Sequence, residues 1–450
     1  MEENKNEELL RLVSEKKFRH LKTELCDMNE VDVAEFIEEV QTDKKIIVFR
    51  MLPKELASDV FACLDVDTQK IIIDGITDKE LAYIIEELYV DDAVDMLEEM
   101  PATVVKRVLQ NASPSTRLQI NEFLNYPENS AGSIMTAEFI GLRKTMTVEE
   151  AFAYIRKHGI DKETIYTCYV MDSKRHLEGV VTVKDLLMNP YDAKIEDIMD
   201  TNVIKAVTTE DKEEIADLFN KYDLLSLPVV DHENRLVGIV TIDDAVDVME
   251  EEATEDIEKM AAILPTDKPY FKMTTFETYK KRMPWLLLLM ISATFTGAII
   301  TSYEEALASY VILTAYIPML MDTGGNAGSQ ASVSVIRGLS IGEIEFKEIF
   351  KVIWKELRVA VLCGITLASA NFVKLLLVDK LALPVAFVIC VTLVVVVVFA
   401  KFIGCVLPLI AERIGFDPAV MASPLITTIV DAVSLTVYFT IAVAVLHISV

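Results

Sequence analysis

The residues best suited to chemistry in this chain are two aspartates inside long apolar segments. Asp322 lies in the stretch 318–330, which is also rich in glycine and amide side chains, and Asp431 lies in the last apolar segment, 419–450. A carboxylate and glycine-rich backbone are costly in hydrocarbon, so they normally face a protein-lined cavity or an ion path. The pair therefore predicts a cation pathway across a membrane.

The spacing in the last segment places hydroxyl groups beside the second carboxylate. Pro424, Thr427, Thr428 and Asp431 stand at i, i+3, i+4 and i+7, hence on one helix face. The threonines have an alternative role, because they can bond back to the carbonyls of their own helix. No Lys or Arg in the segment neutralises Asp431, which favours a functional role for this carboxylate.

The glycines near Asp322 predict an irregular helix. Gly324 and Gly325 follow Pro318 closely, so we expect a break or kink that releases carbonyls to an ion or its waters. The alternative is that these glycines only allow close helix packing. Asp322 itself either lines the path or caps a half-helix near the inner mouth.

The available ligands indicate the kind of ion. These polar faces offer oxygen atoms without histidine or cysteine, which suits a hard cation such as Mg²⁺ or Ca²⁺ better than Zn²⁺ or Cu⁺. Mg²⁺ sheds its water reluctantly and is often held by one or two carboxylates. One aspartate on a polar face, doubled by a symmetric dimer, therefore favours hydrated Mg²⁺.

Five apolar segments must position these residues, and each is long enough to cross a bilayer core. They lie near Pro284–Ser302, Leu307–Ile336, Val359–Val378, Pro384–Ile410 and Ala419–Ile448. Basic residues precede the first segment and separate the second from the third, so the positive-inside rule places the N-terminus in the cytoplasm and the C-terminus outside. The amphipathic stretch Ile341–Lys355 predicts a separate helix on the inner surface.

Composition narrows the function further. The 450 residues carry a formal net charge of -28, which argues against nucleic-acid binding and suits a protein that attracts cations. The acids crowd residues 1–260, which we expect to remain in the cytoplasm. The six cysteines are scattered, as in a reduced protein, and no nucleophile elbow, P-loop or HExxH motif indicates an enzyme.

The first 128 residues predict stacked helix pairs. Apolar residues recur at helical spacing, and the segments beginning Leu52-Pro53 and Met100-Pro101 resemble each other. Asp91, Asp92 and Asp95 lie at the start of one predicted helix, where capping and the helix dipole are the alternative explanation for them.

Residues 133–251 hold a tandem repeat in which each copy reads strand–helix–strand–strand–helix. Leu177–Leu186 and Leu236–Ala245 share the pattern apolar-Gly-apolar-Val-Thr-x-x-Asp, which resembles a CBS domain. CBS pairs often bind adenosine nucleotides, and the resemblance implies ribose contacts from Asp185 and Asp244. The alternative is a module for dimerisation and signal relay only.

An acidic helix, Asp247–Met260, follows the repeat with few compensating bases. Like charges repel unless cations screen or bridge them. This helix therefore predicts an electrostatic latch that closes with Mg²⁺ and separates without it.

The order of these parts, together with Asp-Thr-Gly-Gly-Asn-x-Gly-x-Gln at 322–330, resembles the MgtE family of bacterial magnesium channels and transporters. The resemblance implies a homodimer with the pore on its two-fold axis and a hydrated Mg²⁺ at Asp431. It implies pore-lining positions at Asp322, Gly325, Asn326, Ser423 and Thr427. The family commonly has asparagine at the position of Ser423 and a smaller residue at that of Thr427.

The resemblance also implies regulatory Mg²⁺ ligands in the cytoplasmic parts. They map onto Asp59, Asp91 and Asp95 in the helical domain, Glu213 and Asp223 in the second CBS copy, Asp244, Asp247, Glu252, Glu255 and Asp256 in the linking region, and Asp417 in an inner loop.

The sequence thus predicts a multidomain protein, α plus α/β plus α-helical membrane, with a helical superhelix N domain, a CBS pair, an acidic linking helix and five transmembrane helices. The expected parts are residues 1–128, CBS copies 129–190 and 191–248, a linking helix 249–280 and a pore domain 281–450. The predicted function is a Mg²⁺-gated import channel of the inner membrane with Mg²⁺ as substrate and regulator, ATP as a candidate ligand, and the bilayer and a second copy as partners.

Other classes of protein remain open on the sequence. They are a CBS-regulated transporter that exchanges another divalent ion or H⁺, a receptor whose apolar half only anchors a nucleotide sensor, an intramembrane enzyme, and a CBS-linked anion channel. An anchor needs no buried acid, the histidines are poorly placed for catalysis, and an anion filter would want positive elements that are missing.

Overall fold

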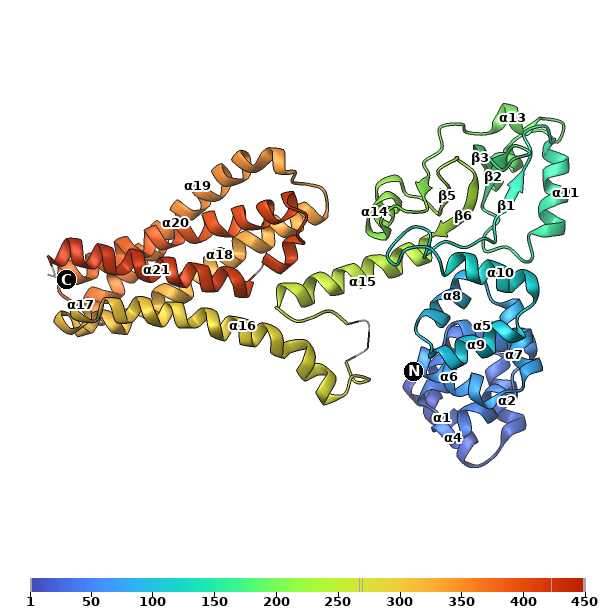
Figure 1. Ribbon diagram of the computed structural model, residues 1–450, viewed down its shortest axis with the longest axis horizontal. Coiled ribbons are helices and arrows are strands. Elements are labelled where there is room, and N and C mark those ends of the chain that lie inside the picture. The colour runs from blue at the N-terminus through green and yellow to red at the C-terminus, as the bar shows by residue number, and fades with distance from the viewer. Residues whose placement is uncertain (1, 267, 269, 422, 448–450) are drawn as a thin grey trace. The chain divides into compact units, whose positions relative to one another are not determined.

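The computed structural model describes residues 2–266, 268, 270–421 and 423–447, without the side chains of 2–4, 305–307 and 423. The chain divides into two compact units, Met1–Met249 and Glu250–Val450, each considered by itself below (Figure 1).

The first part of unit 1 is a stack of short helices, as predicted. They are α1 (Glu2–Ser14), α2 (Phe18–Cys26), α3 (Glu30–Glu39), α4 (Thr42–Phe49), α5 (Lys54–Ala62), α6 (Val66–Gly75), α7 (Asp78–Glu87), α8 (Val90–Glu98), α9 (Ala102–Asn111) and α10 (Pro114–Phe123). Local caps start many of them. Asp65 accepts the Thr68 N–H at 2.6 Å, and Thr77 and Glu80 form a capping box. The chain packs α3 on α5, α5 on α7 and α7 on α9, so that the apolar faces form one continuous core.

The second part of unit 1 contains two similar three-stranded sheets. The first copy has β1 (Ile140–Leu142), α11 (Val148–His158), β2 (Thr167–Met171), β3 (Leu177–Thr182), α12 (Val183–Met188) and α13 (Ile195–Ile198). The second has β4 (Ala206–Val207), α14 (Lys212–Tyr222), β5 (Ser226–Val230), β6 (Leu236–Thr241) and α15 (Ile242–Met260). In each sheet the first strand is parallel to the second and the second antiparallel to the third. The predicted element order of both copies is confirmed.

The two copies exchange their entry segments. Thr136, at the start of the first copy, bonds Ile239 on β6, and Asp200, at the start of the second, bonds Val180 on β3. The glycine of each repeat motif permits this crossing. A Cβ on Gly238 would lie 2.6 Å from the Thr136 carbonyl oxygen, and one on Gly179 would lie 2.9 Å from that of Asp200. The repeated glycine is therefore a packing requirement of the paired domains.

Unit 2 is built from long helices. They are α16 (Thr275–Ser302), α18 (Ile317–Ser340), α19 (Ile349–Leu377), α20 (Leu383–Arg413) and α21 (Ser423–Leu446), with the short α17 (Glu304–Ser309), η1 (Val311–Tyr316), η2 (Phe346–Glu348) and η3 (Pro418–Met421) between them. Among the described residues, four stretches are long and apolar enough to cross a membrane: Thr275–Ser302, Phe346–Leu377, Leu383–Arg413 and Pro418–Leu446. Helix α18 also has membrane length but is more polar, because it carries Asp322 and its neighbours. It packs against both α20 and α21 (Figure 1).

The expected break at Gly324-Gly325 is wrong, because α18 is one continuous helix through both glycines. The reason is close packing. A Cβ on Gly324 would lie 2.8 Å from Val396 on α20, and one on Gly404 of α20 would lie 2.2 Å from the Gly328 carbonyl oxygen. Small residues let these helices approach, which was the alternative reading of the motif.

The separate surface helix expected at Ile341–Lys355 is also wrong. The chain turns at Gly342, where φ is +66°, passes through η2, and then enters α19 at Ile349. The second half of the predicted amphipathic segment is therefore the first turns of a membrane-length helix.

Candidate cation sites

The helical domain and the CBS pair bring acidic residues together within unit 1. Asp91 and Asp92 lie at the start of α8, Glu163 in the loop before β2, and Asp244 at the start of α15. Capping does not explain Asp91, because the N-cap of α8 is Tyr89 and makes no side-chain cap bond. The Asp91 carboxylate instead accepts the N–H of Asp92 at 3.1 Å and is only 9% exposed.

The electrostatics of this acidic cluster favour a bound cation. Burial, then the neighbouring carboxylates, raises the pKa of Asp91 well above its usual range, that of Asp92 to about 6 and that of Glu163 to about 7. Every charged neighbour that shifts these three pKa values is itself acidic. Carboxylates that repel one another in a partly buried site are stabilised when a cation joins them.

The other two ligands predicted in the helical domain, Asp59 and Asp95, are not at the centre of this acidic cluster. Asp59 on α5 and Glu138 both act on the pKa of Tyr89, which burial and these acids raise to about 12. Asp59 itself has a raised pKa through burial and the nearby Glu30 and Glu55. Asp95 is exposed further along α8. The structure thus places Asp59 at the edge of the cluster.

The two aspartates of the repeat motif have a structural task. Asp185 accepts the Thr182 N–H at 3.0 Å and its hydroxyl at 2.5 Å, which starts α12. Asp244 accepts the same two groups of Thr241 at 3.3 and 2.5 Å and starts α15. In both cases a single carboxylate oxygen, Oδ2, makes the cap, which leaves Oδ1 able to face a ligand.

Glu213 and Asp223 do not meet within one chain. Glu213 lies in the first turn of α14, and Asp223 follows its last residue with a left-handed φ of +51°. Ten residues of helix separate them by about 15 Å along the axis. A site that used both would have to draw them from different molecules or serve two ions.

At the end of the linking helix, within unit 2, a lysine side chain bridges two carboxylates. Helix α15 is continuous from Ile242 to Met260, so the last CBS helix and the predicted linker are one element. Lys259 pairs with Glu255 and lies 2.6 Å from Asp417 in the loop before α21. Burial and the Asp417 charge raise the pKa of the neighbouring Asp256.

Met260 packs beside Ile336 and Ala419. Lys259 was not predicted, although a lone base four residues after Glu255 was a visible signal.

Helices α18 and α21 bring two pairs of the predicted pore residues near each other, Asp322 with Asp431 and Gly325 with Thr427. Among the described groups, Oδ1 of Asp431 is buried without a hydrogen-bond partner, and so is Oγ of Ser434. Asp322 is near enough to act on Asp431 electrostatically. A Cβ on Gly325 would lie 2.9 Å from Thr427 Cγ2. Ser434 was missed, although it continues the series Thr427, Asp431 at the next helical step.

Two further predictions on α21 have different outcomes. The Thr428 hydroxyl donates to the Pro424 carbonyl at 3.0 Å, so the back-bonding alternative is correct for this residue. The side chain of Ser423 lies outside the part of the chain that the structure describes, so its predicted pore-lining role stays a prediction.

Helix α18 presents a polar stripe on its outer face. Asp322, Asn326, Gln330 and Ser334 recur every four residues and are all exposed, whereas Gly324 and Gly328 are buried on the opposite side. Polar side chains along a membrane helix must face water or protein. This stripe therefore requires a partner surface or an aqueous path.

A buried ion pair in unit 2 was not predicted. Lys401 on α20 is 5% exposed and lies 3.4 Å from Glu356 on α19. A lysine inside the apolar stretch 384–410 was the available signal. Pairing with Glu356 on the preceding helix explains how the charge is tolerated.

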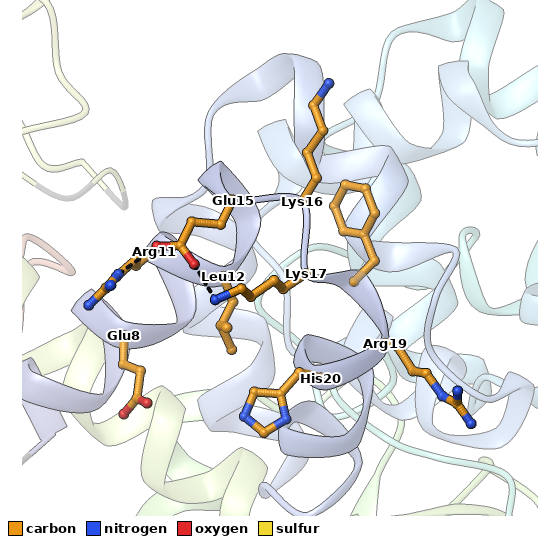
Figure 2. A pocket seen from close by; sticks show the side chains of 9 residues that line it. Glu8, Arg11, Leu12, Glu15, Lys16, Lys17, Arg19 and His20 are labelled. Carbon is orange, nitrogen blue, oxygen red and sulfur yellow. Dashed lines mark hydrogen bonds and ion pairs between the residues drawn. The ribbon is translucent and has the colours of Figure 1, made fainter.

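Within the described residues, no three acidic, histidine or cysteine side chains form a preformed metal cage. A cleft of about 600 Å³ lies elsewhere, between α1 and α2. Figure 2 shows its basic side chains, of which Arg11 and Lys17 already pair with Glu15.

Comparisons with known proteins identify these parts. Residues 28–129 match the MgtE intracellular N domain, residues 131–191 and 195–251 match CBS domains, and residues 317–441 match MgtE, a divalent cation transporter domain. Fold and sites thus define a multi-pass membrane transport protein with a CBS pair. The chain is 35% identical to the magnesium transporter MgtE of Thermus thermophilus, with 98% of each chain covered. It is 31% identical to that of Bacillus subtilis, covering 97% of this chain and 96% of the relative. The chain belongs to the MgtE family of magnesium transporters.

A solved structure supports the fold of the helical domain and the CBS pair. The cytosolic domain of the Mg²⁺ channel MgtE in complex with ATP matches with a TM-score of 0.51 and 36% identity, covering 53% of this chain and 98% of that one.

Proposed function

We propose that this protein imports Mg²⁺ through a membrane channel that cytoplasmic Mg²⁺ closes. The observation that carries the ion path is the buried Asp431 oxygen without a partner among the described groups, on the helix face that meets α18. A hydrated Mg²⁺ can satisfy a carboxylate through its waters, and Asp322, Asn326 and Thr427 would line the same path. Gly325 lets the Thr427 side chain approach α18.

A second copy of the chain would complete this path. The polar stripe of α18 is open in one protomer, and a symmetric partner would bury it around a shared aqueous axis. We place the N-terminus in the cytoplasm and the C-terminus outside because Lys280, Lys281 and Arg282 precede the apolar part of α16, as the positive-inside rule expects. The lipid bilayer surrounds the remaining apolar faces.

The gate would respond to Mg²⁺ at two acidic regions joined by α15. In unit 1, Mg²⁺ would relieve the repulsion among Asp91, Asp92, Glu163 and Asp244. In unit 2, the same helix ends against the loop that leads into α21, where Lys259 contacts Asp417. A ligand that binds the closed arrangement more tightly shifts the population toward it. The proposed regulatory ligands remain Asp59, Asp91, Asp95, Glu213, Asp223, Asp244, Asp247, Glu252, Glu255, Asp256 and Asp417.

A nucleotide at the CBS pair is a further part of the proposal. Oδ1 of Asp185 and of Asp244 is not used by the capping interactions described above and could accept ribose hydroxyls. The ATP complex of the related cytosolic domain supports nucleotide binding by the pair, and the role of the two aspartates is our proposal.

The test is Mg²⁺ flux into proteoliposomes that contain the full chain. We expect Asp431→Asn to lower flux at least about tenfold, which corresponds to about 1.4 kcal/mol of barrier. Thr436→Val, on an exposed part of the same helix, should leave flux unchanged. Flux that survives Asp431→Asn would place the ion path elsewhere.

The gating part is tested in the same vesicles with Lys259→Met. Because this change removes a contact between α15 and the Asp417 loop, we expect half-closure to need about two- to fivefold more Mg²⁺, as for loss of a modest ion pair. Lys259→Arg, which keeps the charge, should behave like the parent chain. A lower closing concentration would mean that Lys259 only competes with Mg²⁺.

A further inference from the structure

The segment that leads into α16 carries exposed aromatic rings that no described residue covers. Phe271 is 96% exposed, Tyr270 68%, Phe276 63% and Tyr279 54%. Large aromatic side chains left in water lower stability unless another surface covers them. These residues precede Pro284, where the apolar part of α16 begins.

The exposed rings lie among positive charges in an otherwise acidic chain. Residues 268–283 contain five lysine or arginine residues and one acid, Glu277, whereas the whole chain has a net charge of -28. Lys280 lies over the Phe276 ring at 4.9 Å, and Lys268 pairs with Glu277 at 3.3 Å. Lys280 and Arg282 are exposed as well, so the segment presents positive charge to its surroundings.

The local structure arranges rings and charges on one surface. A capping box between Thr274 and Glu277 starts α16, so Phe276, Tyr279 and Lys280 share a helix face at i, i+3 and i+4. The rings of Phe276 and Tyr279 stack at 6.0 Å with 16° between their planes. Aromatic rings beside lysines at the end of a membrane helix match the boundary between headgroups and acyl chains.

We propose that residues 270–282 bind the anionic phospholipid headgroups of the membrane surface from which α16 enters. The rings insert at the level of the glycerol backbone, and Lys280 and Arg282 contact lipid phosphates. Because residues 270–282 lead directly into the membrane-length part of α16, we assign this surface to lipid. Lys281 links this segment to the residues that follow α15. Its carbonyl accepts the Leu264 N–H at 3.1 Å, and its ammonium donates to the Pro265 carbonyl. The site would therefore also hold the chain beyond α15.

The test uses the full chain in nanodiscs, with a fluorescent reporter at the proposed depth. Phe271→Trp is made in a chain whose two native tryptophans, Trp285 and Trp354, are replaced by Phe. The lipids carry bromine on the acyl carbons nearest the headgroup, which quenches only a nearby indole. We expect at least twofold stronger quenching in discs with 30% phosphatidylglycerol than in pure phosphatidylcholine.

The combined change Lys280→Gln and Arg282→Gln should abolish the dependence on phosphatidylglycerol. Leu118→Trp, on exposed α10, is the matched control and should be quenched weakly in both discs. Quenching at residue 271 no stronger than at residue 118, or equal in the two lipids, would overturn the proposal. The measurement needs neither Mg²⁺ nor flux, so its outcome is independent of the proposed channel activity.

Discussion

At the scale of single residues, the acidic cluster is defined by one buried carboxylate, Asp91, and by the partly buried Asp92, Glu163 and Asp244 near it. Glu163 contributes most clearly to pH dependence, because its pKa is raised from 4.5 to about 7. In the metal-free protein the folded state binds this proton more tightly than the unfolded chain. Its contribution to stability is therefore favourable at low pH and is lost as pH rises through about 7.

Mg²⁺ should compete with that proton. The Mg²⁺ concentration that half-protects the helical domain of the full chain from protease should rise about tenfold between pH 8 and pH 6. Glu163→Gln should weaken binding at pH 8 and flatten the pH dependence. Asp161→Asn, two residues away and exposed, should behave like the parent. A pH-independent Mg²⁺ effect would exclude the cluster as the binding site.

At the scale of elements, close packing of α18 on α20 organises the membrane unit. Gly404→Ala places a methyl group 2.2 Å from the Gly328 carbonyl oxygen, a backbone atom that cannot turn away. We expect a loss of about 1–3 kcal/mol of stability, as for other overpacked interiors. In detergent this should lower the thermal midpoint by several degrees.

Gly297→Ala on α16 is the control, because a Cβ there meets nothing within 4 Å. Alanine also favours helix over glycine by about 1 kcal/mol, so this change should be neutral or stabilising. Equal effects at the two positions would argue that the α18–α20 contact does not depend on small residues.

At the scale of the whole molecule, the polar stripe of α18 predicts a dimer. In a chain with its six cysteines replaced, Asn326→Cys should give crosslinked dimers with a short thiol-specific reagent in membranes. Leu362→Cys, 69% exposed on the apolar surface of α19, should remain monomeric under the same conditions. A monomeric Asn326→Cys chain would mean that something other than a second copy covers the stripe.

The sequence by itself determined the identity and order of the parts. Helical periodicity and the similar segments at Leu52-Pro53 and Met100-Pro101 predicted the stack of short helices, and the repeated Gly and Asp predicted the CBS pair, because these signals are local. The intramembrane Asp431 also stood out, since a carboxylate in an apolar segment needs no tertiary information to be unusual.

Only the tertiary structure decided which residues meet. Glu163 lies near enough to Asp91 to act on it electrostatically although the two are far apart in the sequence, and Lys259 reaches Asp417 across more than 150 positions of the chain. No local pattern encodes such pairs. The glycines of α18 show the same limit, because Gly324-Gly325 suits both a kink and a close helix contact, and the neighbouring Val396 and Ser434 select the second.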